Sequence, residues 1–93
     1  MTSGETHSRT FRIKNELGIH ARPAALIVKT SNAYAAEIVF EKDGNTASGK
    51  SIIGLLTIEG NPGSEVKVTA TGSDAIEAVA ALEELFENKF FED

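Results

Sequence analysis

The sequence predicts an α+β fold, an open-faced sandwich in which a four-stranded antiparallel sheet carries three helices, one of them short, on one face. Two long segments, 21–32 and 75–86, repeat apolar residues at helical spacing, and shorter segments alternate apolar with polar residues. The order is strand, helix, two strands, a short helical turn, strand and helix. A β-α-β-β-α-β core with one more helix closes as an antiparallel sheet with its helices on one face.

The first strand is expected to follow a short leader. Residues 1–6 are small and polar, and we expect them to be flexible, whereas residues 7–93 have the usual size of one domain. Phe11 and Ile13 alternate with basic residues, which is typical of a half-buried strand. The sequence NELG that comes next favours a turn.

The first long helix is predicted to start just after His20 or Arg22. Pro23 fits an α-helix only in its first turn, where backbone N–H groups have no intrahelical acceptor. Behind it, apolar residues recur at spacings of 3 and 1 and form one helix face. These residues are Ala24, Ile27 and Val28.

The middle of the chain predicts a hairpin and a short helix. The segment EIVFEKDGNTASG indicates two strands joined at Asp43–Gly44, a dipeptide suited to a tight turn. The segment KSIIGLLTIEG is short and apolar and contains Gly54, so it favours a single helical turn over a long element.

The last strand and helix follow a loop, NPGSE. Val66, Val68 and Ala70 alternate with polar residues and indicate the strand. Asp74 with Glu77 three residues later resembles a capping box, with aspartate in the Ser/Thr role. The apolar residues of the helix after it recur at spacings of 4, 3 and 4; they are Ala75, Val79, Leu82 and Phe86.

Composition excludes several classes of function. The net charge of −5 argues against nucleic-acid binding, which needs a positive surface. The chain has no cysteine, so disulfides, thiolate metal sites and thiol chemistry are excluded. The apolar segments are too short to cross a bilayer, and the first ten residues lack a signal peptide's apolar core. We therefore expect a cytoplasmic protein that binds neither membrane nor nucleic acid.

His20 is the candidate reactive residue. The start of a helix carries a partial positive charge and unpaired N–H groups, which bind anions and favour a neutral imidazole with a free lone pair. Arg22 adds a permanent cation suited to phosphoryl oxygens. A metal site is not expected, because His20 has no His or Cys companion at ligand spacing. The chemistry alone leaves both a helix cap or surface residue and a phosphoryl-accepting residue open.

The sequence LGIHARPAALIV, 17–28, resembles the active-site segment of the HPr family, the histidine-containing phosphocarriers of the bacterial phosphoenolpyruvate–sugar phosphotransferase system. Residues 49–85 resemble the regulatory-serine region, last strand and last helix of that family. The resemblance implies the HPr-like βαββαβα fold and a monomeric phosphoryl carrier that is not an enzyme and needs no cofactor. It further implies that His20 is phosphorylated on Nδ1 by phosphorylated enzyme I and that Arg22 steadies the phosphoryl group, which then passes to EIIA-type domains.

The same resemblance implies a regulatory role for Ser51. It matches the serine that HPr kinase/phosphorylase modifies, and a phosphoserine would add about −1.5 to −2 charges beside apolar residues. A plain helix-capping role is compatible with this. A transcriptional co-regulator is a further expected partner of the phosphorylated form. The expected partner-binding residues are Ala21, Ala25, Leu26, Ile52, Ile53 and Leu56.

Three alternatives remain at this point. The acidic tail and aliphatic SIIGLL are reminiscent of the nitrogen-related branch of the system, whose carriers regulate rather than feed transport. A small hydrolase resembling acylphosphatase would use Arg22 and a backbone nest for phosphate, and Asn15 or Asn45 to orient water. A pure interaction module would need only the surface around Ser51.

Overall fold

The computed structural model describes residues 5–92 and confirms the predicted α+β class. The elements in chain order are β1 (Thr6–Arg12), α1 (Ala21–Ser31), β2 (Glu37–Lys42), β3 (Asn45–Ser48), α2 (Ile52–Thr57), β4 (Glu65–Thr71), α3 (Ala75–Glu87) and a single 3₁₀ turn, η1 (Lys89–Phe91). The four strands form one sheet in the order β1-β4-β2-β3, and every neighbouring pair is antiparallel.

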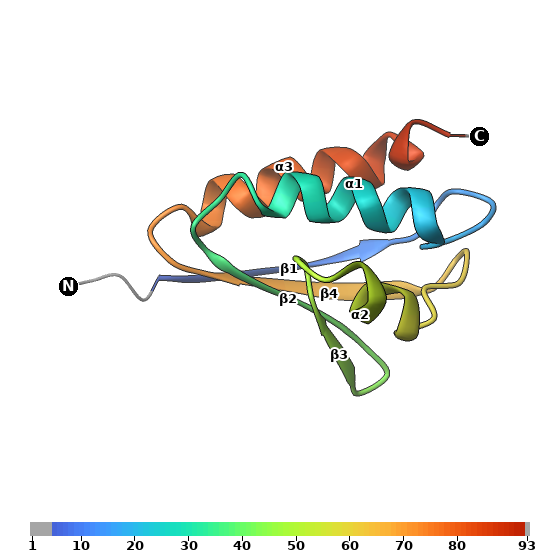
Figure 1. Ribbon diagram of the computed structural model, residues 1–93, viewed down its shortest axis with the longest axis horizontal. Helices are drawn as coiled ribbons and strands as arrows, with labels where there is room; N and C mark the ends of the chain where they lie inside the picture. The colour runs from blue at the N-terminus through green and yellow to red at the C-terminus, as the bar shows by residue number, and fades with distance from the viewer. Residues whose placement is uncertain (1–4, 93) are drawn as a thin grey trace.

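The helices form a layer over the sheet. Figure 1 shows α1 and α3 side by side above the strands, with α2 lying against α1 and the outer strand β3. Side-chain burial alternates along the strands: the residues that face the helices are buried, and their neighbours are exposed or only partly buried. The buried residues include Phe11, Phe40, Val66 and Val68. One apolar core therefore holds the sheet and both long helices together.

The hairpin confirms its local prediction. Asp43 and Gly44 both have positive φ, 53° and 83°, and Lys42 pairs directly with Asn45. These are the dihedral signs of a type I′ turn, which matches the twist of the strands that it joins. Strand β1 begins at Thr6, inside the segment expected to be a leader, because Thr6 pairs with Thr71 of β4. Residues 1–4 of that segment lie outside the described residues.

The predicted capping box at the start of α3 is wrong. Asp74 is the N-cap residue, but its side chain makes no capping bond. Its carboxylate instead accepts hydrogen bonds from the backbone N–H groups of Ala35 and Ala36, at 2.8 and 2.9 Å. The Asp74 carboxylate therefore binds the loop before β2 instead of its own helix. These two hydrogen bonds connect the start of α3 to that loop.

The chain ends in a turn that the sequence did not predict. After α3, Lys89, Phe90 and Phe91 all have φ between 52° and 60°, the left-handed region that residues other than glycine rarely adopt. Phe90 is fully buried and packs edge-on against Phe86, with ring centroids 4.9 Å apart. This turn directs the following residue, Glu92, back toward the start of α1.

Candidate functional site

His20 occupies the N-cap position of α1, where the sequence placed it. Its backbone is extended, with φ −95° and ψ −166°, and its side chain makes no capping hydrogen bond. The imidazole is therefore not a helix cap. The side chain is 35% exposed, so a partner can reach the ring.

The loop before His20 has a fixed shape. Gly18 has φ +67°, and a Cβ at this position would lie 2.1 Å from the carbonyl oxygen of Gly60. Only glycine fits this close approach. Ile19 then donates its N–H to the same carbonyl at 2.8 Å and buries its side chain. The loop after α2 thus holds the segment that presents His20.

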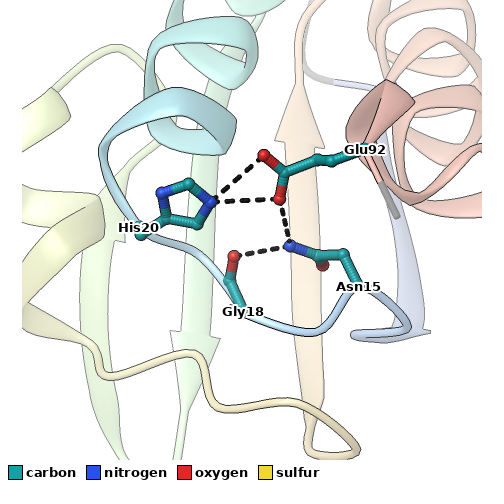
Figure 2. A network of polar contacts seen from close by, with 4 residues as sticks. All are labelled: Asn15, Gly18, His20 and Glu92. Atoms are coloured by element: carbon teal, nitrogen blue, oxygen red, sulfur yellow. Dashed lines mark hydrogen bonds and ion pairs between the residues drawn. The ribbon is translucent and has the colours of Figure 1, made fainter.

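A polar network surrounds one side of the imidazole. His20 Nε2 lies 3.0 Å from Glu92 Oε1 and 3.2 Å from Oε2. Asn15 Nδ2 donates to the same Oε1 at 2.9 Å and to the carbonyl of Gly18 at 2.7 Å. Figure 2 shows Glu92 and Asn15 facing the same side of the His20 ring, with the second ring nitrogen directed away from them.

The network fixes the roles of the two ring nitrogens. A carboxylate only accepts hydrogen bonds, so Nε2 must donate and carries the proton. In a neutral ring the lone pair is then on Nδ1, which has no hydrogen-bond partner among residues 5–92. An imidazole nitrogen with a free lone pair is a nucleophile, so the geometry presents Nδ1 for reaction.

Electrostatics keep Glu92 ionised. The hydrogen bond from His20 is the main reason that the pKa of Glu92 lies below its ordinary value of 4.5. The hydrogen bond from Asn15 and the charges of His20 and Arg22 lower this pKa further, while desolvation opposes them. A negative carboxylate therefore faces the ring at neutral pH.

Arg22 lies in the first turn of α1 and its side chain is exposed. Among the described residues it forms no hydrogen bond or ion pair, although its charge acts on Glu92. The first-turn N–H groups of α1 also have no intrahelical acceptor. The guanidinium and the helix start are both available to an anion beside His20.

Ser51 is the N-cap of α2, as expected. Its Oγ accepts a hydrogen bond from the N–H of Gly54 at 3.0 Å. Three apolar side chains that follow it are exposed, Ile53 to 77%. They are Ile52, Ile53 and Leu56.

The expected partner-binding residues on α1 divide into two groups. Ala21 and Ala25 are exposed, whereas Leu26 is half-buried and also packs against the core, so its role in partner binding stays a prediction. Leu26 is half-buried because α1 contacts both α3 and α2, which covers a wider arc of the helix than one apolar face. Leu17, which the sequence did not single out, is 70% exposed in the loop before His20.

Sequence reasoning missed two residues of the site. Glu92 belongs to a tail that was described only as acidic, and Asn15 was considered only as a water-orienting residue of a hydrolase. The Asn15 amide is instead bonded to Gly18 and Glu92. No three His, Asp or Glu side chains within residues 5–92 are grouped to hold a metal ion. No helix in that range has the length and apolar composition of a membrane span.

Comparison with known proteins decides the family. The model described as "PTS HPr component phosphorylation site" matches residues 7–88, nearly the whole chain. The chain belongs to the HPr family. Its HPr relatives are phosphocarrier proteins of the phosphotransferase system, which is the role that family membership supports for this chain.

Named relatives cover almost the full length. The HPr of Treponema pallidum is 39% identical, covering 91% of this chain and 97% of the relative. A phosphocarrier named NPr from Klebsiella oxytoca is 37% identical, covering 95% of this chain and 99% of the relative. The crystal structure of HPr-C-His from Thermoanaerobacter tengcongensis superposes with a TM-score of 0.90 at 42% identity, covering 94% and 98% of the two chains. The HPr-like fold predicted from the sequence is thus confirmed.

Proposed function

We propose that His20 is the residue of this phosphocarrier that accepts and donates the phosphoryl group. The observation that carries the proposal is the geometry of the ring. Nε2 is bonded to Glu92, whereas Nδ1, at the start of a helix beside Arg22, has no partner among residues 5–92, and the same holds for the Arg22 guanidinium. Phosphorylated enzyme I is the proposed donor and EIIA-type domains are the proposed acceptors.

The transfer needs no cofactor. The lone pair of His20 Nδ1 forms a bond to the phosphorus atom while the donor's bond to phosphorus breaks, and the electron pair of that bond stays with the donor. Arg22 and the first-turn N–H groups then face the phosphoryl oxygens. In the second step Nδ1 leaves with its electron pair and the acceptor takes the group. The protein is itself the acceptor in the first reaction and the donor in the second, so it acts as a carrier and not as an enzyme.

The test uses purified protein with enzyme I and labelled phosphoenolpyruvate. We expect the intact chain to gain one acid-labile phosphoryl group and His20→Ala to gain none. His7→Ala is the matched control and should be labelled normally, because His7 lies in β1 and takes no part in the network at His20. Labelling of the His20→Ala protein would overturn the proposal.

The proposed docking surface joins α1 and α2. Ala21 and Ala25 are exposed on α1, and the exposed apolar residues after Ser51 lie on α2, which packs against it. An apolar surface of this kind is typical of a protein–protein contact site. We propose that this monomeric carrier uses it in the cytoplasm for enzyme I and for acceptor domains, and that it binds no nucleic acid.

We propose that HPr kinase/phosphorylase modifies Ser51. The hydroxyl caps α2 at a half-buried position next to Ile52 and Ile53. A phosphate there can still cap the helix but adds about −1.5 to −2 charges beside a surface that works by dry apolar contact. Phosphorylation is expected to weaken docking to enzyme I and to create a site for a transcriptional co-regulator.

Substitutions at Ser51 test this regulation. Ser51→Asp is expected to raise the Kd for enzyme I several-fold, whereas Ser51→Ala, which lacks the charge, should bind like the intact chain. Calorimetric titration measures both. Equal affinities of all three proteins for enzyme I and for a co-regulator would contradict the regulatory role.

A nitrogen-related branch with regulatory output is the second candidate. The observation in its favour is that the NPr of Klebsiella oxytoca is nearly as similar to this chain as the HPr of Treponema pallidum, at 37% and 39% identity. Parallel labelling with the enzyme I proteins of the two branches separates them. The branch whose donor gives the larger kcat/KM is the one that this carrier serves.

A further inference from the structure

We propose that Glu92 is a positioning residue for phosphoryl transfer, which holds Nε2–H of His20 throughout the cycle and balances the positive charge that the ring gains when Nδ1 is phosphorylated. The inference rests on the proposed function of His20. Glu92 lies beyond residues 7–88, which match the family model, so membership of the family does not by itself assign this role.

The contact between the Glu92 carboxylate and His20 Nε2 is well defined and mostly shielded from solvent. Both carboxylate oxygens lie within 3.2 Å of Nε2, and the Glu92 side chain is only 15% exposed. The fully buried Asn15 donates to one of these oxygens and is itself fixed by the carbonyl of Gly18. Asn15 thus fixes the same carboxylate oxygen that lies 3.0 Å from His20 Nε2.

The backbone that carries Glu92 is held in a conformation that residues other than glycine disfavour. Three consecutive residues, Lys89 to Phe91, have φ between 52° and 60°. The burial of Phe90 against Phe86 stabilises this turn, and so does the hydrogen bond from Glu92 N–H to the carbonyl of Lys89 at 3.0 Å. Such strain persists only where the surrounding contacts demand it, and here they place a carboxylate on a reactive ring.

The chemistry gives this carboxylate a task in both steps. When Nδ1 bonds to phosphorus, Nε2 keeps its proton and the ring becomes a phosphoimidazolium with one positive charge. Glu92, 3.0 Å away, stabilises that charge. When the bond from Nδ1 to phosphorus breaks, the same retained proton makes the leaving group a neutral imidazole. The lowered pKa of Glu92 keeps the carboxylate ionised at neutral pH.

The test compares Glu92→Gln with Glu87→Gln. Both changes remove one negative charge from the C-terminal part of the chain, but Glu87 pairs with Lys14 and does not contact His20. After phosphorylation by enzyme I of protein labelled with ¹⁵N-histidine, the Nε2 resonance of phosphorylated His20 is titrated with pH. The charged groups that act on this contact are Glu92 from the C-terminal segment and Arg22 from α1.

We expect Glu92→Gln to weaken proton binding at Nε2 of the phosphorylated ring by about tenfold, the lower end of the effect of an adjacent opposite charge, because the site is partly exposed. The kcat for phosphoryl uptake should fall by a similar factor, with the KM for enzyme I unchanged because the docking surface is untouched. Glu87→Gln should match the intact chain in both measurements.

Two results would overturn the inference. One is a Glu92→Gln protein with the titration and kcat of the intact chain, and the other is an equal change in Glu87→Gln, which would make the effect one of overall charge. Failure of the intact chain to be labelled on His20 would instead refute the proposed function. Thermal unfolding of each variant identifies any loss that comes from misfolding.

Discussion

At the scale of single residues, Asn15 joins two ends of the chain that are distant in sequence. Its buried amide donates to Gly18 in its own loop and to Glu92, 77 positions further on. Its carbonyl oxygen is buried and has no partner within residues 5–92. A buried polar atom without a partner is costly, and this cost offsets part of the stability that the two donated bonds of Asn15 contribute.

The ion pair at His20 predicts a pH dependence of folding. The pKa of Glu92 is lowered in the folded chain, mainly by the hydrogen bond from His20, so the unfolded chain binds a proton at a higher pH than the folded chain does. The stability that Glu92 contributes is therefore complete above about pH 4.5, the ordinary value, and is lost as the pH falls through the folded-state pKa.

Urea unfolding between pH 3 and pH 6 measures this effect. The difference in unfolding free energy between the intact chain and Glu92→Gln should be constant above about pH 5 and shrink below about pH 4.5. Glu87→Gln serves as the exposed control, since its ion pair with Lys14 is on the surface. A difference that stays constant down to pH 3 would contradict the lowered pKa of Glu92.

At the scale of elements, the structures that depend on neighbouring residues were predicted correctly, whereas contacts between residues distant in sequence were not. Asp43–Gly44 and Ser51 were identified because a type I′ turn and an N-cap depend on residues within three positions. Asp74 was assigned to its own helix, but its partners are 38 and 39 positions earlier. No local pattern carries that information, because it depends on how the segments meet in the fold.

The residues of the candidate site show the same difference between local and distant contacts. His20, Arg22 and Pro23 were found because they form one compact motif at a helix start. Glu92 was missed because its partner lies 72 positions earlier and the tail sequence ENKFFED is polar at both ends. Phe90, a large apolar residue just after the helix, was a signal that the chain could turn back to the core, but the sequence analysis did not use it.

Asp74 provides a prediction for the loop before β2. Asp74→Ala should lower the unfolding free energy by about 2 kcal/mol, because two backbone N–H groups lose a charged acceptor. Glu77→Ala should change it by less than about 0.5 kcal/mol, since Glu77 is exposed and the capping box that would employ it is absent. Chemical denaturation measures both unfolding free energies. A loss in Glu77→Ala as large as in Asp74→Ala would indicate that the capping box forms after all.

At the scale of the whole molecule, the aromatic core extends to the C-terminal turn that precedes Glu92. Phe86 stacks on Phe11 of β1, with ring centroids 4.8 Å apart, and lies 6.3 Å from the ring of Phe40 on β2. Phe90 packs edge-on against the same Phe86, with ring centroids 4.9 Å apart. The position of Glu92 at His20 is thus set by the packing between the sheet and α3, and not by the short terminal turn alone.

This continuity predicts that a core substitution acts on the site. Phe90→Ala should lower the unfolding free energy by about 3 kcal/mol through loss of a buried ring, and should also release Glu92 from His20 because the left-handed turn loses its anchor. Phe91→Ala is the matched control, since its ring is 62% exposed and should cost less than about 0.5 kcal/mol. Urea unfolding and the ¹⁵N spectrum of His20 measure the two effects together. A Phe90→Ala protein that is destabilised but keeps the His20 spectrum of the intact chain would show that Glu92 holds the ring without the core.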